Sequence, residues 1–302
     1  MHHYFTPFYK KLFVSSLFIL LFGLWYSAEH KTDVFLPYPD LINHEGKVHS
    51  SLVAIAKVLY PKEAPAERDS AKIWNAFLQK NFLRPETQDH QEAQKAGQHP
   101  KHLELLPHFK SLRLIDEIMP EQREFDVIII FGGTPWDTEE RFRWVNTLVT
   151  ERGIKTKAFI YINGKRLLKS SELDWLKGKK FENITYQHEA AKALWDCSYL
   201  LKKDPLAIIT VAPPPGRRAN TNDTLIAFLK YKKENDIHSV LFITNGHYGP
   251  YQFETASMVI KGSLQFEGSS SPSNDNVSTV SLTDTLARRF YTIVQNYSAK
   301  PG

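Results

Sequence analysis

The chain has 302 residues, of which 42% are hydrophobic and 24% are charged, a composition that is ordinary for a globular protein and excludes general disorder. Its net charge is +5, but the lysines and arginines form no dense run, so nothing favours nucleic acid as a partner. A single cysteine excludes an internal disulfide and a cysteine-based zinc motif.

The first 28 residues have the pattern of a membrane-targeting segment. Lys10 and Lys11 precede an apolar run over 12–26, which matches a signal sequence but is shorter than the roughly 20 residues of a usual bilayer span. An uncleaved anchor, a cleaved signal and a buried core helix are all open interpretations. Trp25 and Tyr26 are too bulky for a cleavage site, so we predict an anchor over residues 1–28. The lysines then place the N-terminus in the cytoplasm and the bulk of this single-pass chain outside the inner (cytoplasmic) membrane.

Residues 29–118 are predicted to be a helical accessory region. Their apolar spacing predicts helices over 51–59, 70–82 and 107–119. Residues 85–101 are polar without periodicity and are expected to form a loop. Seven of the twelve histidines fall in this region, but their scatter fits no ligand spacing, so we expect no metal site.

From residue 119 to residue 302 the pattern changes to alternating strands and helices. Strands are expected over 125–131, 157–162, 206–211 and 238–244, with a fifth over 277–282. Helices are expected over 137–151, 187–201, 221–233 and 283–297. The serine-rich stretch 268–276 is expected to be a surface loop. This alternation predicts an α/β fold with an open, mostly parallel sheet and helices on both faces.

Ligands of open parallel sheets lie beyond the carboxyl ends of the strands, and the first two predicted ends carry distinctive residues. Gly132 and Gly133 follow the first strand and precede a helix that Asp137 is expected to cap, where backbone amides and the helix N-terminus favour an anion. The alternative is a plain tight turn. Asn163 and Gly164 follow the second strand, either as ligand contacts or as a solvated turn.

The third predicted strand end is basic. Arg217 and Arg218 precede Asn220 and Thr221 at the start of a helix, a combination that suits a phosphate or a carboxylate. The alternative is a solvated basic loop in which Thr221 is simply the helix cap.

Asn245 follows the fourth predicted strand, and His247 lies two residues further on. His247 is the candidate catalytic acid or base, with a loop histidine bonded to the backbone as the alternative. The chain lacks a nucleophile elbow, a P-loop and a dinucleotide fingerprint. Spacing therefore indicates neither a reaction nor a cofactor, and whether the protein is an enzyme stays open.

Four segments resemble the YdcF/SanA/ElyC-like family, over roughly residues 125–260. The similar segments are 125–133 (FDVIIIFGG) with an arginine in the next helix, 188–191 (HEAA, the family's "sEA"), 220–223 (NTND, its "nTxEN") and 241–247 (LFITNGH, its "vllVTsxxH"). The resemblance adds Arg141 and Glu189 to the candidate ligand-binding residues. Pro250 stands where family members usually carry an arginine, and an acidic residue expected before the third segment is absent, so the chain resembles a divergent member.

The resemblance implies a role in the cell envelope. We therefore expect a membrane-tethered envelope-homeostasis protein that binds a phosphorylated or otherwise anionic envelope metabolite, or a lipid-linked phosphate, at the carboxyl ends of its strands. The alternative is a non-catalytic envelope scaffold or interaction protein, which Pro250 and the missing acidic residue favour.

Overall fold

The structure is a computed structural model in which residues 36–84, 98–198, 205–273 and 276–298 are described. All of these residues belong to one compact unit, Val34–Gly302. The predicted membrane anchor, residues 1–28, lies outside the described residues. No helix within the described ranges is both long and apolar enough to cross a membrane.

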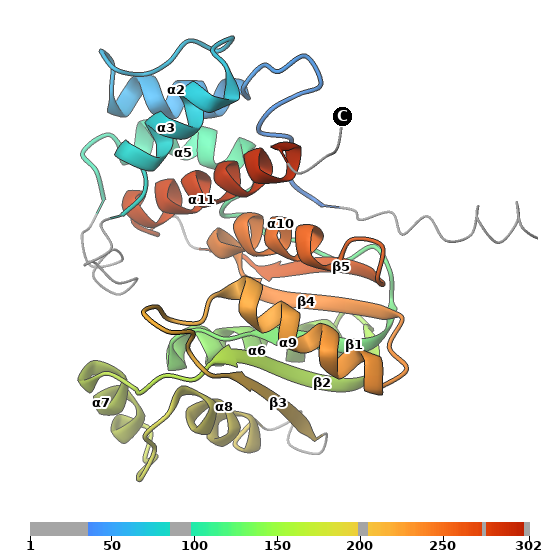
Figure 1. The fold of residues 1–302 in the computed structure, drawn as a ribbon. Coiled ribbons are helices and arrows are strands. Elements are labelled where there is room, and N and C mark those ends of the chain that lie inside the picture. Colours follow the sequence, from blue (N-terminus) through green and yellow to red (C-terminus); the bar gives the residue numbers. More distant parts are fainter. Residues whose placement is uncertain (1–35, 85–97, 199–204, 274–275, 299–302) are drawn as a thin grey trace, which may run out of the picture. The chain divides into compact units, whose positions relative to one another are not determined.

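A five-stranded sheet forms the centre of this unit (Figure 1). Its strands are β1 Glu124–Phe131, β2 Lys155–Gly164, β3 Leu206–Val211, β4 Ser239–Asn245 and β5 Gln265–Ser271. They lie in the order β3-β2-β1-β4-β5, and every neighbouring pair is parallel, which confirms the predicted parallel α/β sheet. The strand order reverses between β1 and β4, because the chain after β3 crosses back over the sheet. Open α/β sheets bind ligands at such a switch point.

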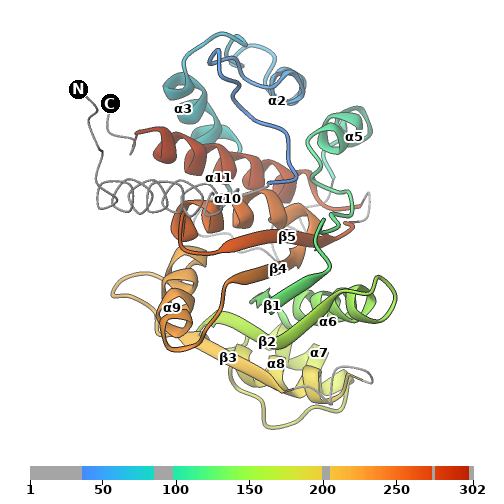
Figure 2. The ribbon, with the colours of Figure 1, turned by 90° about the vertical axis from the view of Figure 1, so that its right-hand side faces the viewer.

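Helices cover both faces of the sheet (Figure 2). The helices are α6 Pro135–Thr150 and α8 Gln187–Asp196 on one face, and α9 Thr221–Glu234 and α10 Gly249–Ile260 on the other. Side chains along β1 alternate between the two layers: Ile128 and Ile130 pack with α6 and α8, whereas Ile129 and Phe131 pack with α9 and α10. A strand buried on both faces explains the continuous apolar run.

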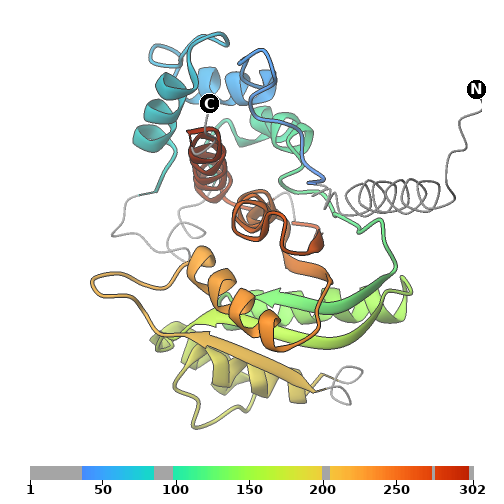
Figure 3. The same ribbon diagram turned by 45° about the vertical axis from the view of Figure 1, so that its right-hand side comes forward.

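The N-terminal helices share a hydrophobic core with the last helix (Figure 3). These elements are α2 Ser50–Leu59, α3 Ala71–Asn81, α5 His102–Ser111 and α11 Thr279–Ser298. Leu282 and Leu286 of α11 are fully buried in this cluster, and α11 also packs on α10. The layer formed by α2, α3, α5 and α11, called the helical layer below, therefore packs against the sheet through α11 and α10.

Two predictions at the end of the chain were wrong. The strand expected over 277–282 is largely the first turn of α11, and residues 268–271 of the expected surface loop form the buried end of β5. A Cβ at Gly268 would collide with the ring of Phe253, so this strand needs small residues because α10 packs directly on its backbone. Small, polar residues are needed at this close contact, but they are also typical of loops, so the sequence predicted a loop.

Three further helices differ from the prediction. α5 covers His102–Ser111 instead of 107–119, so Pro107 lies inside it. Burial of Leu105 and Phe109 in the core outweighs the backbone hydrogen bond that this proline removes. α10 and the short helix α7 Ser170–Gly178 were not predicted, and α10 begins with a Gly-Pro pair that resembles a turn signal.

Candidate functional site

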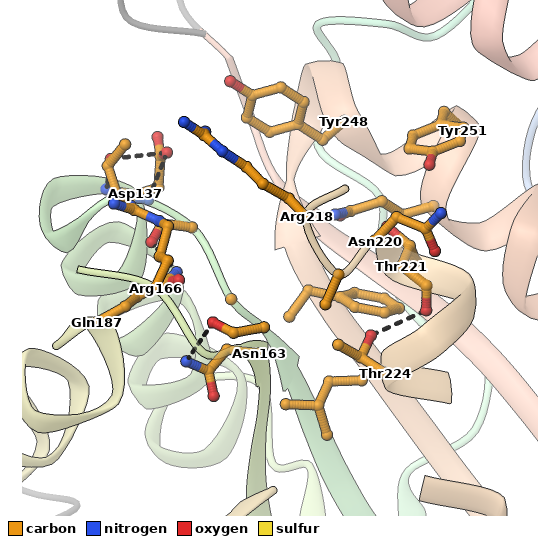
Figure 4. A pocket seen from close by; sticks show the side chains of 18 of the residues that line it. Asp137, Asn163, Arg166, Gln187, Arg218, Asn220, Thr221, Thr224, Tyr248 and Tyr251 are labelled. Atoms are coloured by element: carbon orange, nitrogen blue, oxygen red, sulfur yellow. Dashed lines mark hydrogen bonds between the residues drawn. The ribbon is translucent and has the colours of Figure 1, made fainter. Parts of the chain in front are cut away.

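A pocket of about 430 Å³ opens at the carboxyl ends of β1 and β2, beside the switch point (Figure 4). Its lining combines three parts of the fold: the sheet edge, the loop before α9, and the helices α10 and α11. The principal lining residues are Gly132, Gly133, Asn163 and Gly164 from the sheet edge, Arg218, Asn220 and Thr221 from the loop and α9, and Tyr248, Tyr251 and Arg288 from the helical side.

Glycine is required where β1 ends. A Cβ at Gly132 would lie 2.6 Å from the Cβ of Asn163, and a Cβ at Gly133 would lie 3.0 Å from Nη1 of Arg141. Gly164 at the end of β2 is constrained in the same way, because its Cβ would lie 2.9 Å from that of Ala219. The glycines therefore allow the backbone, Asn163 and Arg141 to converge on one side of the pocket.

The N-termini of α6 and α9 line the pocket. Thr134, and not Asp137 as predicted, caps α6: its Oγ1 accepts from the Asp137 amide at 3.2 Å, and the Asp137 carboxylate accepts from the Thr134 amide and hydroxyl. Asn220 caps α9 through the Asp223 amide, so Thr221 is the first helical residue and not the cap. Each N-terminus adds partial positive charge to the pocket.

Arg141 is a buried cation in the pocket wall. Its side chain is 1% exposed, and it donates from Nε to Oδ1 of Asn245 and from Nη1 to the Phe131 carbonyl, both at 2.5 Å. Its guanidinium also lies 5.9 Å from the ring centre of Tyr248. No carboxylate of the described residues is in ion-pair contact with it, so neutral acceptors hold this charge in place.

The loop before α9 separates the two adjacent arginines. The Arg217 amide donates to the Pro214 carbonyl, and Gly216 has a φ of +75°, the signature of a type II turn after Pro215. Arg217 then points along α9, where its guanidinium forms a two-pronged ion pair with Asp223 at 2.6 and 2.8 Å. Arg217 does not line the pocket.

Arg218 turns the other way, into the pocket. Figure 4 shows its side chain extending between Tyr248 and Asp137. Within the described part of the chain, no carboxylate makes an ion pair with Arg218. It is therefore an exposed cation whose position over the pocket is set by a stiff proline-glycine turn.

The remaining charged groups leave the pocket positive. Among the described residues, seven cationic side chains line it, against the two carboxylates Asp137 and Asp284. Arg166 forms a two-pronged ion pair with the fully buried Glu172, at 2.7 and 2.6 Å, behind the lining. Arg288 approaches Asp284 to 2.9 Å. Even with these pairs, cations outnumber carboxylates, so the pocket has the electrostatics of an anion site.

His247 lies below the pocket and does not line it. The turn after β4, Gly246–Tyr248, directs the Tyr248 side chain to the pocket and packs His247 inside at 5% exposure. Its Nδ1 lies 3.0 Å from the Ser273 hydroxyl, and burial lowers its pKa to about 4. The side chain predicted to be catalytic is thus a neutral, interior histidine at ordinary pH.

The structure brings most of the predicted site residues together. Those that line the pocket are Gly132, Gly133, Arg141, Asn163, Gly164, Arg218, Asn220 and Thr221. Four do not: Asn245 lies under the lining and holds Arg141, Glu189 accepts from the amides at the start of α8, and Arg217 and His247 point elsewhere. Glu189 accepts from backbone amides of residues 185 and 186, which lowers its pKa.

Sequence reasoning missed the lining residues from the helical layer. Arg84 follows α3, and Asp284, Thr285 and Arg288 belong to α11, so none of them stands at a strand end. The spacing of Asp284 and Arg288 by four residues predicts only a pair on one helix face. Their approach to the sheet edge depends on tertiary packing. Among the described residues, no group of three or more histidine, cysteine or acidic side chains is placed to hold a metal.

A search against protein families and a search of curated proteins both find no match to this chain. Its class is therefore set by the fold and the pocket: a parallel α/β domain with a basic, partly aromatic pocket at the switch point of its sheet.

Proposed function

We propose that the protein binds a phosphorylated or otherwise anionic ligand in this pocket. The observation that carries the proposal is Arg141, a buried guanidinium at the pocket wall whose described partners are all neutral. A buried charge is costly unless an opposite charge compensates it. A ligand anion against the lining would supply that compensation, and arginine binds phosphate and carboxylate with two parallel hydrogen bonds.

Other features of the pocket support an anion. Arg218 reaches into it without an ion-pair partner among the described side chains, and the N-termini of α6 and α9 face the same space. A volume of about 430 Å³ falls in the range of small-molecule sites, about 300–1,000 Å³. The ligand is therefore expected to be a small phosphorylated metabolite or the headgroup of a larger molecule.

The envelope part of the proposal rests on the sequence. The resemblance to the YdcF/SanA/ElyC-like family and the apolar segment within residues 1–28 support a membrane-tethered protein of the cell envelope. In this proposal the pocket faces the extracytoplasmic side of the inner membrane, and its ligand is an envelope metabolite or a lipid-linked phosphate.

The arrangement of acidic and basic groups favours binding over catalysis, as in a non-catalytic scaffold or interaction protein. The two carboxylates among the described lining residues already have structural roles: Asp137 completes the cap of α6, and Asp284 contacts Arg288. The histidine expected to act as an acid or base does not line the pocket. The other titratable side chains of the described lining are arginines, lysines and tyrosines, which bind an anion as charges or hydrogen-bond donors.

The two adjacent arginines give a matched test. Calorimetry with inorganic phosphate and pyrophosphate compares the wild type with Arg218→Gln and Arg217→Gln, which remove the same charge one residue apart. A charge-assisted hydrogen bond contributes about 1.5–3 kcal/mol, so Arg218→Gln should weaken binding about tenfold or more. Arg217→Gln should have little effect, because Arg217 pairs with Asp223 outside the pocket. Equal affinities in all three proteins would refute the anion site.

A further inference from the structure

Thr285 of α11 is a buried residue of the pocket lining whose hydroxyl is not used within the fold. The residue is 2% exposed, and its Oγ1 makes no hydrogen bond to any described residue. Two other threonines of α11 differ: Thr283 donates to the Thr279 carbonyl and Thr292 to the Arg288 carbonyl, each at 3.0 Å. A helical threonine can satisfy its hydroxyl in this way. The Thr285 hydroxyl is therefore available to a group in the pocket.

Gln252 of α10 presents a second polar group to the pocket. Its Oε1 accepts a hydrogen bond from the hydroxyl of Thr244, a fully buried residue near the end of β4. This bond orients the amide, whose Nε2 carries two N–H donors and has no hydrogen-bond partner among the described residues. The sheet thus holds the Gln252 amide in place and leaves its donors to a ligand.

Tyr251 adds an aromatic ring and a further hydroxyl on α10. It is half-buried in the pocket lining, and its hydroxyl makes no hydrogen bond within the described ranges. Figure 4 shows it on the side of the pocket opposite Asp137 and Gln187. Asp137 belongs to the N-terminus of α6, the part of the pocket that favours an anion. The pocket therefore combines an anionic end with a wall of polar groups on α10 and α11.

The arginine of α11 in this wall is already paired. Arg288 donates from Nε and Nη2 to the carboxylate of Asp284, at 2.9 and 3.2 Å. An opposite charge therefore compensates Arg288 without a ligand. The groups of this wall that still lack a partner are neutral: the hydroxyls of Thr285 and Tyr251 and the amide nitrogen of Gln252.

These neutral groups suit a part of the ligand that itself carries hydroxyls. A hydroxyl both donates and accepts, so Thr285 and Tyr251 can bond a ligand hydroxyl in either direction, and Gln252 can donate to its oxygen. An alkyl group in the same place would cover the polar groups without bonding them, which weakens binding. The volume of about 430 Å³ also belongs to ligands larger than phosphate alone.

We infer that the ligand is a polyol phosphate or sugar phosphate, with its hydroxyl-bearing part against Thr285, Gln252 and Tyr251. Its phosphoryl group then lies at the end of β1 and the N-terminus of α6. This inference rests on the proposed anion-binding function and names the chemical class of its ligand. A free sugar phosphate and the phosphorylated polyol headgroup of a lipid share this chemistry.

The test measures a preference by calorimetry. The ligands are orthophosphate, three polyol phosphates (glucose 6-phosphate, myo-inositol 1-phosphate and glycerol 3-phosphate) and cyclohexyl phosphate, which has the ring of the inositol compound without its free hydroxyls. The tightest polyol phosphate should bind at least about tenfold more tightly than cyclohexyl phosphate. Thr285→Val keeps the shape of the side chain and removes the hydroxyl, so this preference should fall about five- to tenfold. Thr285→Ser, which keeps the hydroxyl, should retain most of it.

Thr283→Val is the matched control on the same helix. The Thr283 hydroxyl bonds the backbone of α11, and the residue does not line the pocket, so this variant should leave the preference unchanged. Thermal unfolding checks that each variant is folded. Thr285→Val should be at least as stable as the wild type, because the hydroxyl that it removes is buried without a partner in the described fold.

Vesicles distinguish the two sources of the ligand. Phosphatidylcholine vesicles with and without phosphatidylinositol or phosphatidylglycerol present the phosphorylated polyol on a lipid. Binding of either the free or the lipid-held form supports the inference, and the tighter of the two identifies the source. If cyclohexyl phosphate binds as tightly as every polyol phosphate, or if Thr285→Val keeps the full preference, the inference is overturned and the anion site survives. If neither orthophosphate nor any organic phosphate binds, the proposed function itself fails.

Discussion

Arg141 on α6 donates from Nε to Oδ1 of Asn245 at the end of β4, which joins a helix on one face of the sheet to the strand across the switch point. Asn245 is 1% exposed and offers a neutral acceptor where an aspartate would fit. An amide orients the guanidinium without neutralising it, so the positive charge stays available to the pocket.

The Asn245→Asp substitution should therefore weaken anion binding without unfolding the protein. The new carboxylate has the shape of the amide and would pair with Arg141, which offsets the charge that the ligand needs. We expect phosphate affinity to fall about tenfold, which corresponds to about 1.4 kcal/mol. Calorimetry measures the affinity. Asn235→Asp, at the far end of α9, is the control for adding one negative charge, and a similar loss there would show a general effect of net charge.

The end of β1 gives a prediction on stability. Gly132→Ala would place a Cβ 2.6 Å from that of Asn163 and 3.0 Å from the Ile162 carbonyl oxygen, so the sheet edge must shift. Overpacking of this kind typically costs about 1–3 kcal/mol. Urea unfolding should show this loss. Gly178→Ala, at the end of α7, meets no atom within 4 Å and should leave stability unchanged or raise it by less than about 1 kcal/mol.

The sheet could be predicted from sequence where its strands are large and apolar. β1, with Ile128 to Ile130, and β4 are buried on both faces, so their composition alone identifies them. β5 could not be found in this way, because Phe253 packs against Gly268 and Trp144 donates to the hydroxyl of Ser269. Those contacts select small and hydroxylic residues, which are also the residues of loops.

The site was predictable to a similar extent. Strand ends such as Gly132 and Asn163 can be located once the strands are known, because parallel strands end at one edge. The direction of a side chain after the strand cannot be predicted from spacing. The turn at Gly216 directs Arg218 into the pocket and Arg217 away from it. The turn after β4 directs Tyr248, and not His247, to the pocket. Both outcomes depend on local backbone angles and packing.

The ion pair between Arg166 and Glu172 predicts opposite effects of one substitution on stability and on phosphate affinity. Glu172 is fully buried and accepts both prongs of Arg166. Glu172→Gln would leave that guanidinium uncompensated and should destabilise the fold by about 3 kcal/mol, at the low end for a broken buried pair because the Arg166 side chain is 25% exposed. Arg166 lines the pocket, so phosphate affinity should rise as stability falls.

An exposed pair provides the comparison for this variant. Glu124→Gln breaks the solvent-exposed contact between Glu124 and Lys155 and should change neither stability nor phosphate affinity measurably. Urea unfolding and calorimetry on the two variants separate the effects. A fall in both stability and affinity for Glu172→Gln would show that Arg166 needs its partner to stay in the lining.

The lowered pKa of the buried His247 predicts how the stability of the protein depends on pH. Burial lowers the pKa of His247 to about 4, and the charge of Asp137 opposes this lowering while that of Arg141 adds to it. An unfolded histidine has a pKa of about 6.5. Between these values the unfolded state binds a proton and the folded state does not, so the free energy of unfolding falls as pH falls from about 6.5 to about 4. Above pH 6.5 the contribution is constant.

The size of this effect follows from the difference between the folded and unfolded pKa values of His247. A shift of one pKa unit corresponds to about 1.36 kcal/mol, so His247 alone accounts for up to about 3 kcal/mol between pH 6.5 and pH 4. His247→Asn keeps a polar group near the Ser273 hydroxyl but does not titrate. Urea unfolding across this range should show a shallower pH dependence for the variant, and the difference cancels contributions from other groups such as His49. Parallel curves for the two proteins would mean that His247 is protonated inside the fold, and a further cation would then lie beneath the pocket.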